Sequence, residues 1–191
     1  GSNQMVMSAV GHRGYKMYQL GAPPSVWDRI INDQSVSNMK RRGLNIRMAL
    51  EGTLPATILD PEKQLKEVFK CLKDNQILGI AADGAAGENW VLCPFLGRGI
   101  RLGNGPFSIM QRTGCEALPA FMVRDRSGTQ RLEIGKPLAL SGKIDDNAGV
   151  SDSARQFARI LEDYVRQRPG HYLHFLMLRR RMMAQGDPAL L

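Results

Sequence analysis

Residues 77–124 read ILGIAADGAAGENWVLCPFLGRGIRLGNGPFSIMQRTGCEALPAFMVR, and this stretch decides the fold class. A helix is expected within it, because Pro106 suits a first helical turn and Gly114 suits a helix end. Short strands alternating with helices predict an α/β protein. The stretch contains three apolar runs of strand length, at 77–82, 91–95 and 117–123.

The sequence outside this stretch continues the alternation. Further strand-length runs lie at 15–20 and 130–134, and Arg126–Thr129 has the composition of a hairpin turn. We therefore expect one domain: a mixed, mostly parallel central sheet flanked by helices, with one antiparallel hairpin. Helices are predicted at 24–42, 60–74 and 151–168, with caps or stops at Gly43, Asp60, Pro61, Ser151, Asp152 and Pro169.

The composition is ordinary for a globular protein. The chain has 191 residues, of which 43% are hydrophobic and 23% are charged. No apolar run approaches the roughly 18 residues that a membrane-spanning helix needs. The three cysteines, Cys71, Cys93 and Cys115, are too scattered for a disulfide framework or a zinc knuckle, which favours a reducing compartment.

An excess of positive charge narrows the choice of partners. Lysine and arginine number 26 against 18 acidic residues, which gives a net charge of +8. Nucleic acid, anionic lipid and phosphorylated substrates all fit this charge. Nucleic acid fits least well, because no helix-turn-helix, RNP-like strand or zinc motif accompanies the charge. We expect residues 171–183 to form a helix that faces a membrane or another part of the protein, with Arg179–Arg181 at its polar border.

Asp83 is the first candidate site residue. It follows the apolar run 77–82 and begins the small-residue sequence DGAAG. Ligands of open α/β sheets bind at the carboxyl ends of strands, which is where this carboxylate is expected. The alternative, which is favoured when the segment is taken alone, is an aspartate that caps its own turn.

The segment 94–106, PFLGRGIRLGNGP, supplies two further candidates, Arg98 and Arg101. Its glycines, its guanidinium groups and the helix start at Pro106 suit an anion such as a phosphate. No Gly-Lys-Ser/Thr follows and no G-x-G-x-x-G pattern is present, so neither standard nucleotide-binding loop is predicted. The alternative is an ordinary surface loop. We expect Asp83 to face a cleft that is also lined by Arg98 or Arg101.

Taken in order, these segments resemble the bacterial lipid A biosynthesis acyltransferases, the lauroyl/myristoyl transferase branch of the lysophospholipid acyltransferase-like superfamily. The resemblance covers roughly residues 12–182. It rests on a strand ending in an acid, a Pro-Phe-Phe-Gly-Arg element, a Gly-Pro helix start, a helix closed by Thr-Gly, a strand with proline and a closing arginine. The matching positions are Asp83, Pro94–Arg98, Gly105-Pro106, Thr113-Gly114, Pro119 and Arg124.

The resemblance implies an acyltransferase-like α/β fold and a transferase activity. A fatty acyl group would move from a thioester of acyl carrier protein or coenzyme A to a hydroxyl of a glycolipid or lysophospholipid. The reaction would take place at the cytoplasmic face of a bacterial inner membrane, with the protein bound peripherally or anchored. Asp83, Arg98, Arg101 and Arg124 would bind substrate. No metal, redox cofactor or nucleic acid is expected.

Two departures from the family pattern bear on activity. The family's catalytic motif is a histidine followed, after four intervening residues, by Asp or Glu, so that a carboxylate orients the imidazole that deprotonates the acceptor hydroxyl. We place no catalytic residue in this chain, because His12, His171 and His174 are followed at that spacing by Met17, Leu176 and Arg179. In addition, Gly84 stands where the family has glutamine, and 174–181 replaces the family's Trp…His-Arg-Arg ending.

Gly1-Ser2 has the form of a tag remnant. We therefore expect residues 3–191 to be a single acyltransferase-like domain that lacks the N-terminal part of the family fold, with the catalytic pair upstream. The alternative is a catalytically inactive acyltransferase-like protein that binds lipid or a partner.

Overall fold

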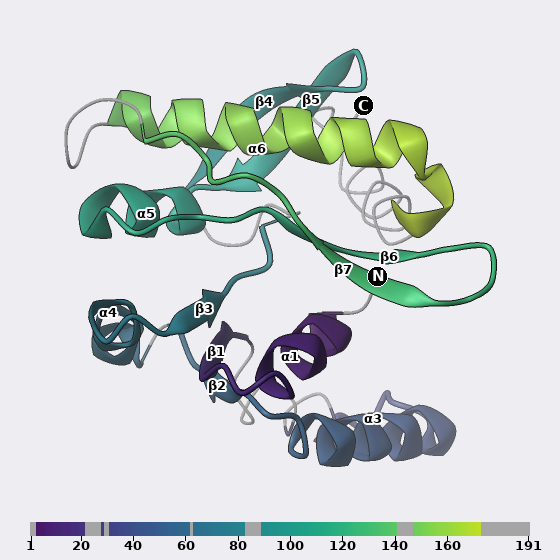
Figure 1. The fold of residues 1–191 in the computed structure, drawn as a ribbon. Coiled ribbons are helices and arrows are strands. Elements are labelled where there is room, and N and C mark those ends of the chain that lie inside the picture. The colour runs from purple at the N-terminus through teal and green to yellow at the C-terminus, as the bar shows by residue number, and fades with distance from the viewer. Residues whose placement is uncertain are drawn as a thin grey trace. The chain divides into compact units, whose positions relative to one another are not determined.

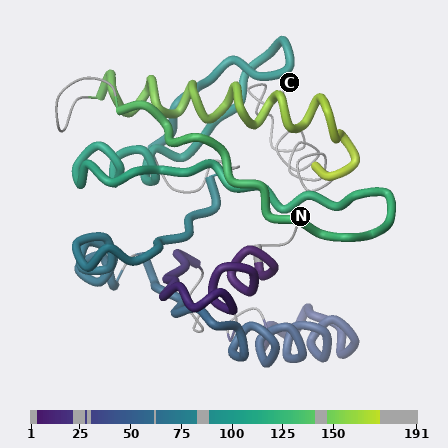
Figure 2. Tube along the Cα trace, viewed as in Figure 1, coloured from purple at the N-terminus to yellow at the C-terminus, as the bar shows by residue number. Residues whose placement is uncertain are grey.

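The fold is α/β, as the sequence predicts, with a parallel sheet and antiparallel strands among helices (Figure 1). The structure is a computed structural model and describes residues 3–21, 28, 31–61, 63–82, 89–140 and 147–172. The chain, traced in Figure 2, groups into two compact units, Ser2–Ala81 and Ala82–Leu191. The expectation of a single domain stays a prediction.

The N-terminal unit is built on a parallel sheet of three short strands in the order β2-β1-β3. The register pairs Tyr18 of β1 with Thr57 on one side and with Leu78 on the other. Helices connect the successive strands, because parallel neighbours need a crossover connection. The elements in chain order are α1 (Asn3–Gly11), β1 (Met17–Leu20), α3 (Asn38–Glu51), β2 (Thr57–Leu59), α4 (Leu65–Lys73) and β3 (Ile77–Gly79).

The helix predicted to stop at Gly43 does not stop there. Residues 24–27 and 29–30 of the predicted segment lie outside the described residues. Beyond them the chain turns, because the Asp33 carboxylate accepts hydrogen bonds of 2.8 Å from both the N–H and the hydroxyl of Ser35. Helix α3 then begins with Ser37 as its N-cap and runs through Gly43 to Glu51. The start of the helix is therefore set by the polar side chains of Asp33 and Ser37, and Gly43 is tolerated within the helix.

Helix α4 begins at Leu65, later than the predicted start near Asp60. The Asp60 carbonyl accepts from the N–H groups of Lys63 and Gln64, and the Asp60 N–H donates to Gln64 Oε1 at 2.8 Å. This turn occupies the place of the expected first helical turn. The helix that follows buries Val68 and Cys71.

The C-terminal unit contains two antiparallel hairpins and the long helix α6, together with two shorter helical elements. Hairpin β4–β5 joins Trp90–Phe95 to Arg98–Gly103, and hairpin β6–β7 joins Ala120–Arg124 to Gln130–Ile134. Helix α6 runs along α5 and across β4 (Figure 1). The helical elements are α5 (Gly105–Thr113), α6 (Asn147–Gln167) and the 3-10 turn η1 (Pro169–Tyr172).

Hairpin β4–β5 overturns the loop predicted at 94–106. Leu96 and Gly97 have φ values of 50° and 78°, as in a two-residue type I′ turn, and the strands on either side pair in register. Ile100 and Leu102 alternate into the core, so the arginines and glycines around them belong to a strand. Antiparallel pairing therefore forms a larger part of the fold than predicted.

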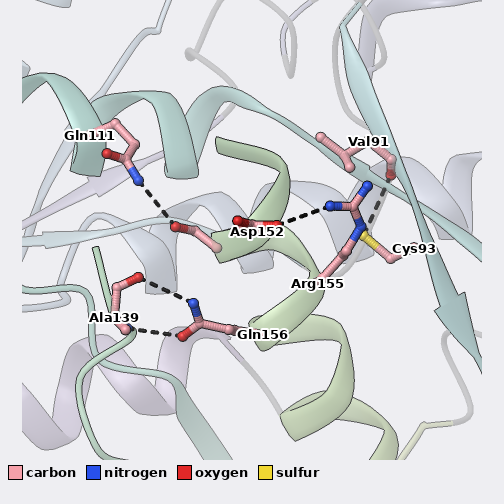
Figure 3. Close-up of polar contacts among 8 residues, drawn as sticks. Val91, Cys93, Gln111, Ala139, Asp152, Arg155 and Gln156 are labelled. Atoms are coloured by element: carbon pink, nitrogen blue, oxygen red, sulfur yellow. Dashed lines mark hydrogen bonds and ion pairs between the residues drawn. The ribbon is translucent and has the colours of Figure 1, made fainter. Parts of the chain in front are cut away.

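The core of the C-terminal unit lies between α6, α5 and the inner face of β4–β5. Ser153, Ala154 and Ala158 are fully buried, so α6 presents small residues to its neighbours. The Gln156 amide exchanges hydrogen bonds of 2.9 and 3.2 Å with the backbone of Ala139, which fixes the segment after β7 on α6 (Figure 3). The buried cluster is Cys93, Phe95, Ile100, Leu102, Phe107, Met110, Leu138, Val150, Ala154, Ala158 and Leu161.

Both ends of α5 and the end of α6 agree with the sequence signals. Helix α5 ends at Thr113 with the predicted Gly114 as its C-cap. Helix α6 ends before Pro169, although it begins at Asn147 rather than near Ser151. The predicted C-terminal helix lies outside the described residues from 173 onward. Of the helices that the structure describes, none has the length and apolar character to cross a membrane.

Gly114 offers a test of the α5 C-cap, because its φ of 65° lies in the left-handed region. We expect Gly114→Ala to lower the free energy of unfolding by about 1 kcal/mol, which is the cost of placing a Cβ there. Gly105→Ala, in the first turn of the same helix, is the control and should change it by less than about 0.5 kcal/mol. Urea unfolding measures both, and equal effects would contradict the assigned cap.

Candidate functional site

The candidate residues predicted from the sequence are distributed over different parts of the fold. Asp83 lies outside the described residues. Arg98 begins β5, Arg101 lies within β5, and Arg124 ends β6. Their roles in substrate binding stay predictions, and the geometry around each arginine indicates what it can contact.

Arg98 and Arg101 belong to opposite faces of hairpin β4–β5, because they are three positions apart on one strand. The register places Arg98 opposite Phe95, on the face that packs against α6. It places Arg101 opposite Leu92, on the outer face. A ligand on the outer face therefore meets Arg101.

Arg101 is held over an aromatic ring. Its Cζ atom lies 4.0 Å from the centroid of the Trp90 ring, which is a cation–π contact. Trp90 is 43% exposed and Leu92 is 53% exposed. The outer face of the hairpin thus combines an indole, an aliphatic side chain and a guanidinium, which suits a ligand with an apolar part and an anionic part.

Arg124 lies in a different place, in a cavity of about 480 Å³ beside the β6–β7 turn and η1. Arg126, Arg131, Arg168 and His171 join it there, and none of them was identified as a site residue from the sequence. These residues come from separate segments of the chain, so their spacing in the sequence does not predict that they lie together. Arg168 and His171 fall within residues 166–181, a stretch with five arginines and no acidic residue, which is a sequence signal for part of this cavity.

A network of polar and aromatic contacts fixes one side of this region. The Tyr164 hydroxyl donates to Glu133 Oε2 at 3.0 Å, and Arg168 Nη2 lies 3.6 Å from Glu133 Oε1. The Phe121 ring stacks on the Tyr164 ring with centroids 4.0 Å apart. Burial raises the pKa of Tyr164, and the hydrogen bond and charge of Glu133 raise it further. The network therefore joins β6–β7 to the end of α6.

The Asp125 carboxylate at the cavity edge is engaged in the hairpin turn. It accepts from Ser127 Oγ at 2.6 Å and from the Thr129 N–H at 2.9 Å. The hydrogen bond from Ser127 is the largest of the effects that lower the pKa of Asp125, so the carboxylate is ionised at neutral pH. Arg124 Nε donates to the Gly128 carbonyl at 3.3 Å, which aligns this arginine with the turn.

The two buried cysteines are poorly suited to act as nucleophiles. Burial raises the pKa of the Cys71 and Cys93 thiols, so both are protonated at neutral pH and are poor nucleophiles. His12 and His171 are exposed. Over the same described ranges, no group of His, Cys, Asp and Glu side chains is arranged to hold a metal ion.

One family model matches most of the chain. It is described as bacterial lipid A biosynthesis acyltransferase and matches residues 31–182. The matched range includes Asp83, both strands of each hairpin, α6 and the arginines of the cavity. None of the curated proteins compared with the chain matches it.

The Tyr164–Glu133 contact offers a test of the cavity wall. We expect Glu133→Gln to lower the pKa of Tyr164 towards its ordinary value, because the neighbouring negative charge is removed while burial remains. The tyrosinate absorbance, taken as the difference from Tyr164→Phe, measures the shift. Glu116→Gln, at an exposed position before β6, should leave the pKa unchanged, and an unchanged pKa in Glu133→Gln would contradict the contact.

Proposed function

The chain belongs to the bacterial lipid A biosynthesis acyltransferase family, and we propose that its residues form the substrate-binding part of an enzyme that transfers a fatty acyl group to a lipid hydroxyl. The donor is a thioester of acyl carrier protein or coenzyme A, and the acceptor is a glycolipid or lysophospholipid. The family match over residues 31–182 is the observation that carries this proposal.

Acyl transfer to a hydroxyl requires a general base and groups that position the two substrates. The acceptor oxygen attacks the thioester carbonyl, a C–O bond forms, the C–S bond breaks and the thiol leaves. The proton of the hydroxyl passes to a general base and then to the leaving thiolate. Arg98, Arg101 and Arg124 lie on different surfaces, so each would bind a separate anionic part of the donor or of the acceptor.

The proposed acceptors reside in a membrane, so the reaction would take place at a membrane surface, which we propose is the cytoplasmic face of a bacterial inner membrane. The net charge of +8 supports this, because anionic headgroups attract basic surfaces. The outer face of β4–β5 supports it further, since Trp90, Leu92 and Arg101 combine the residue types that favour a membrane interface.

The general base is proposed to lie outside these 191 residues. None of His12, His171 and His174 has Asp or Glu at the family's spacing. The same observation favours a second candidate function, an acyltransferase-like protein that binds lipid or a partner without catalysis. The two candidates differ in one measurable property, which is turnover by the native gene product.

We expect the 191-residue chain alone to give no acyl transfer above the rate without protein, because it lacks the paired base. The native gene product should transfer acyl groups from acyl carrier protein or coenzyme A thioesters to a lipid A precursor or a lysophospholipid. Replacement of its paired histidine by alanine should lower the rate by about 10²–10⁴-fold. Mass spectrometry of the lipid products measures the transfer.

Two results would change this assignment. Turnover by the 191-residue chain that is abolished in His12→Ala would place the base within the chain. Lack of turnover by the native gene product with both donors and both acceptor classes, together with retained lipid binding, would establish the non-catalytic alternative.

A further inference from the structure

Four arginines and a histidine line the cavity beside β6–β7 and η1, and the family match assigns it no role. Its volume of about 480 Å³ is within the usual range for small-molecule sites. Arg124 and Arg126 come from the end of β6 and the turn, Arg131 comes from β7, and Arg168 and His171 come from the segment after α6.

The strand register places Arg131 on the face of the hairpin that packs against α6. Residues directly opposite each other on an antiparallel pair share a face, and Arg131 is opposite Val123 just as Glu133 is opposite Phe121. Phe121 and Glu133 both contact Tyr164 of α6. Arg131 is two residues from Glu133 and therefore lies on the same face, towards the end of α6, where Arg168 follows.

The side chains around the cavity carry more positive than negative charge. Four arginines meet two carboxylates, Asp125 at the edge and Glu133 beside Arg168, which leaves an excess of two positive charges before His171 is counted. Asp125 is engaged in the turn, and Glu133 is shared by Tyr164 and Arg168. Within the described part of the chain, the side chains of Arg126 and Arg131 form no hydrogen bond or ion pair.

We propose that this cavity binds a phosphate group of a substrate. A phosphate monoester carries close to two negative charges at neutral pH, which matches the excess, and guanidinium groups bind its oxygens in bidentate fashion. The negative end of the α6 dipole opposes an anion here, but it is equivalent to only about half a unit charge. The Arg168 N–H also satisfies the Tyr164 carbonyl at that helix end, at 3.0 Å.

The assignment of this phosphate to a substrate rests on the proposed function. Two sources share the chemistry of a phosphate monoester: the 3′-phosphate of coenzyme A on the donor side, and a phosphorylated glycolipid on the acceptor side. Both present a phosphate joined to a longer molecule, and the cavity is open enough to admit the group from solvent. Binding experiments with one probe from each side identify the source.

The test compares two double variants that remove the same charge. Arg126→Gln/Arg131→Gln changes the cavity, whereas Arg155→Gln/Arg159→Gln changes exposed arginines elsewhere on α6. Calorimetry at physiological ionic strength measures the binding of coenzyme A and of a phosphorylated glucosamine lipid in detergent. The reference probes are dephospho-coenzyme A, which lacks only the 3′-phosphate, and the dephosphorylated lipid. Urea unfolding of both variants checks that the fold is retained.

We expect at least one phosphorylated probe to bind more tightly than its reference, and the cavity variant to weaken that binding by about tenfold or more. The control variant should bind as the unchanged protein does. An equal loss in both variants, or no preference for the phosphorylated probes, would overturn the proposal. Acyl transfer is measured separately, so a failed phosphate site and a failed acyltransferase assignment give different results.

Discussion

The close packing of α6 on its neighbours is the constraint on which the C-terminal unit depends. Ser153, Ala154 and Ala158 expose none of their surface. Their small side chains let the helix approach β4–β5, whose Phe95 and Leu102 fill the other side. A two-stranded hairpin is at best marginally stable in water, so β4–β5 and β6–β7 both require the helix as a partner.

Helix α6 also positions the side chains that line the arginine cavity. Its first half carries the buried face, and its end carries Tyr164 and Arg168, which reach Glu133 of β7. The position of the arginine cavity is therefore tied to the packing of the core some turns earlier along α6. On the other side of the helix, β4–β5 presents Trp90 and Arg101 on an outer face that packing leaves open. One scaffold thus supports two surfaces suited to the amphiphilic, anionic substrates that we propose.

The sequence predicted those elements whose ends are determined by neighbouring residues, such as caps and turns. Helix α5 follows from its proline and terminal glycine, and β6–β7 follows from a turn sequence between two apolar runs. Strand β5 was missed because glycines and arginines at 98–103 obscured the alternation of Ile100 and Leu102, which was the available signal. Arg124 was identified as a candidate site residue, but the other arginines of its cavity meet only through the tertiary packing of β7 and η1 on β6, which spacing along the chain does not encode.

Ala158→Leu tests the packing of α6 most directly, because Ala158 is fully buried on the face that meets the rest of the unit. The larger side chain should lower the free energy of unfolding by about 1–3 kcal/mol through overpacking. Arg159→Leu, at the next and exposed position of the same helix, should change it by less than about 0.5 kcal/mol. Urea unfolding of the two variants is the decisive measurement. Equal stability of Ala158→Leu and Arg159→Leu would show that α6 does not pack as described, and the positions of both surfaces would have to be reassigned.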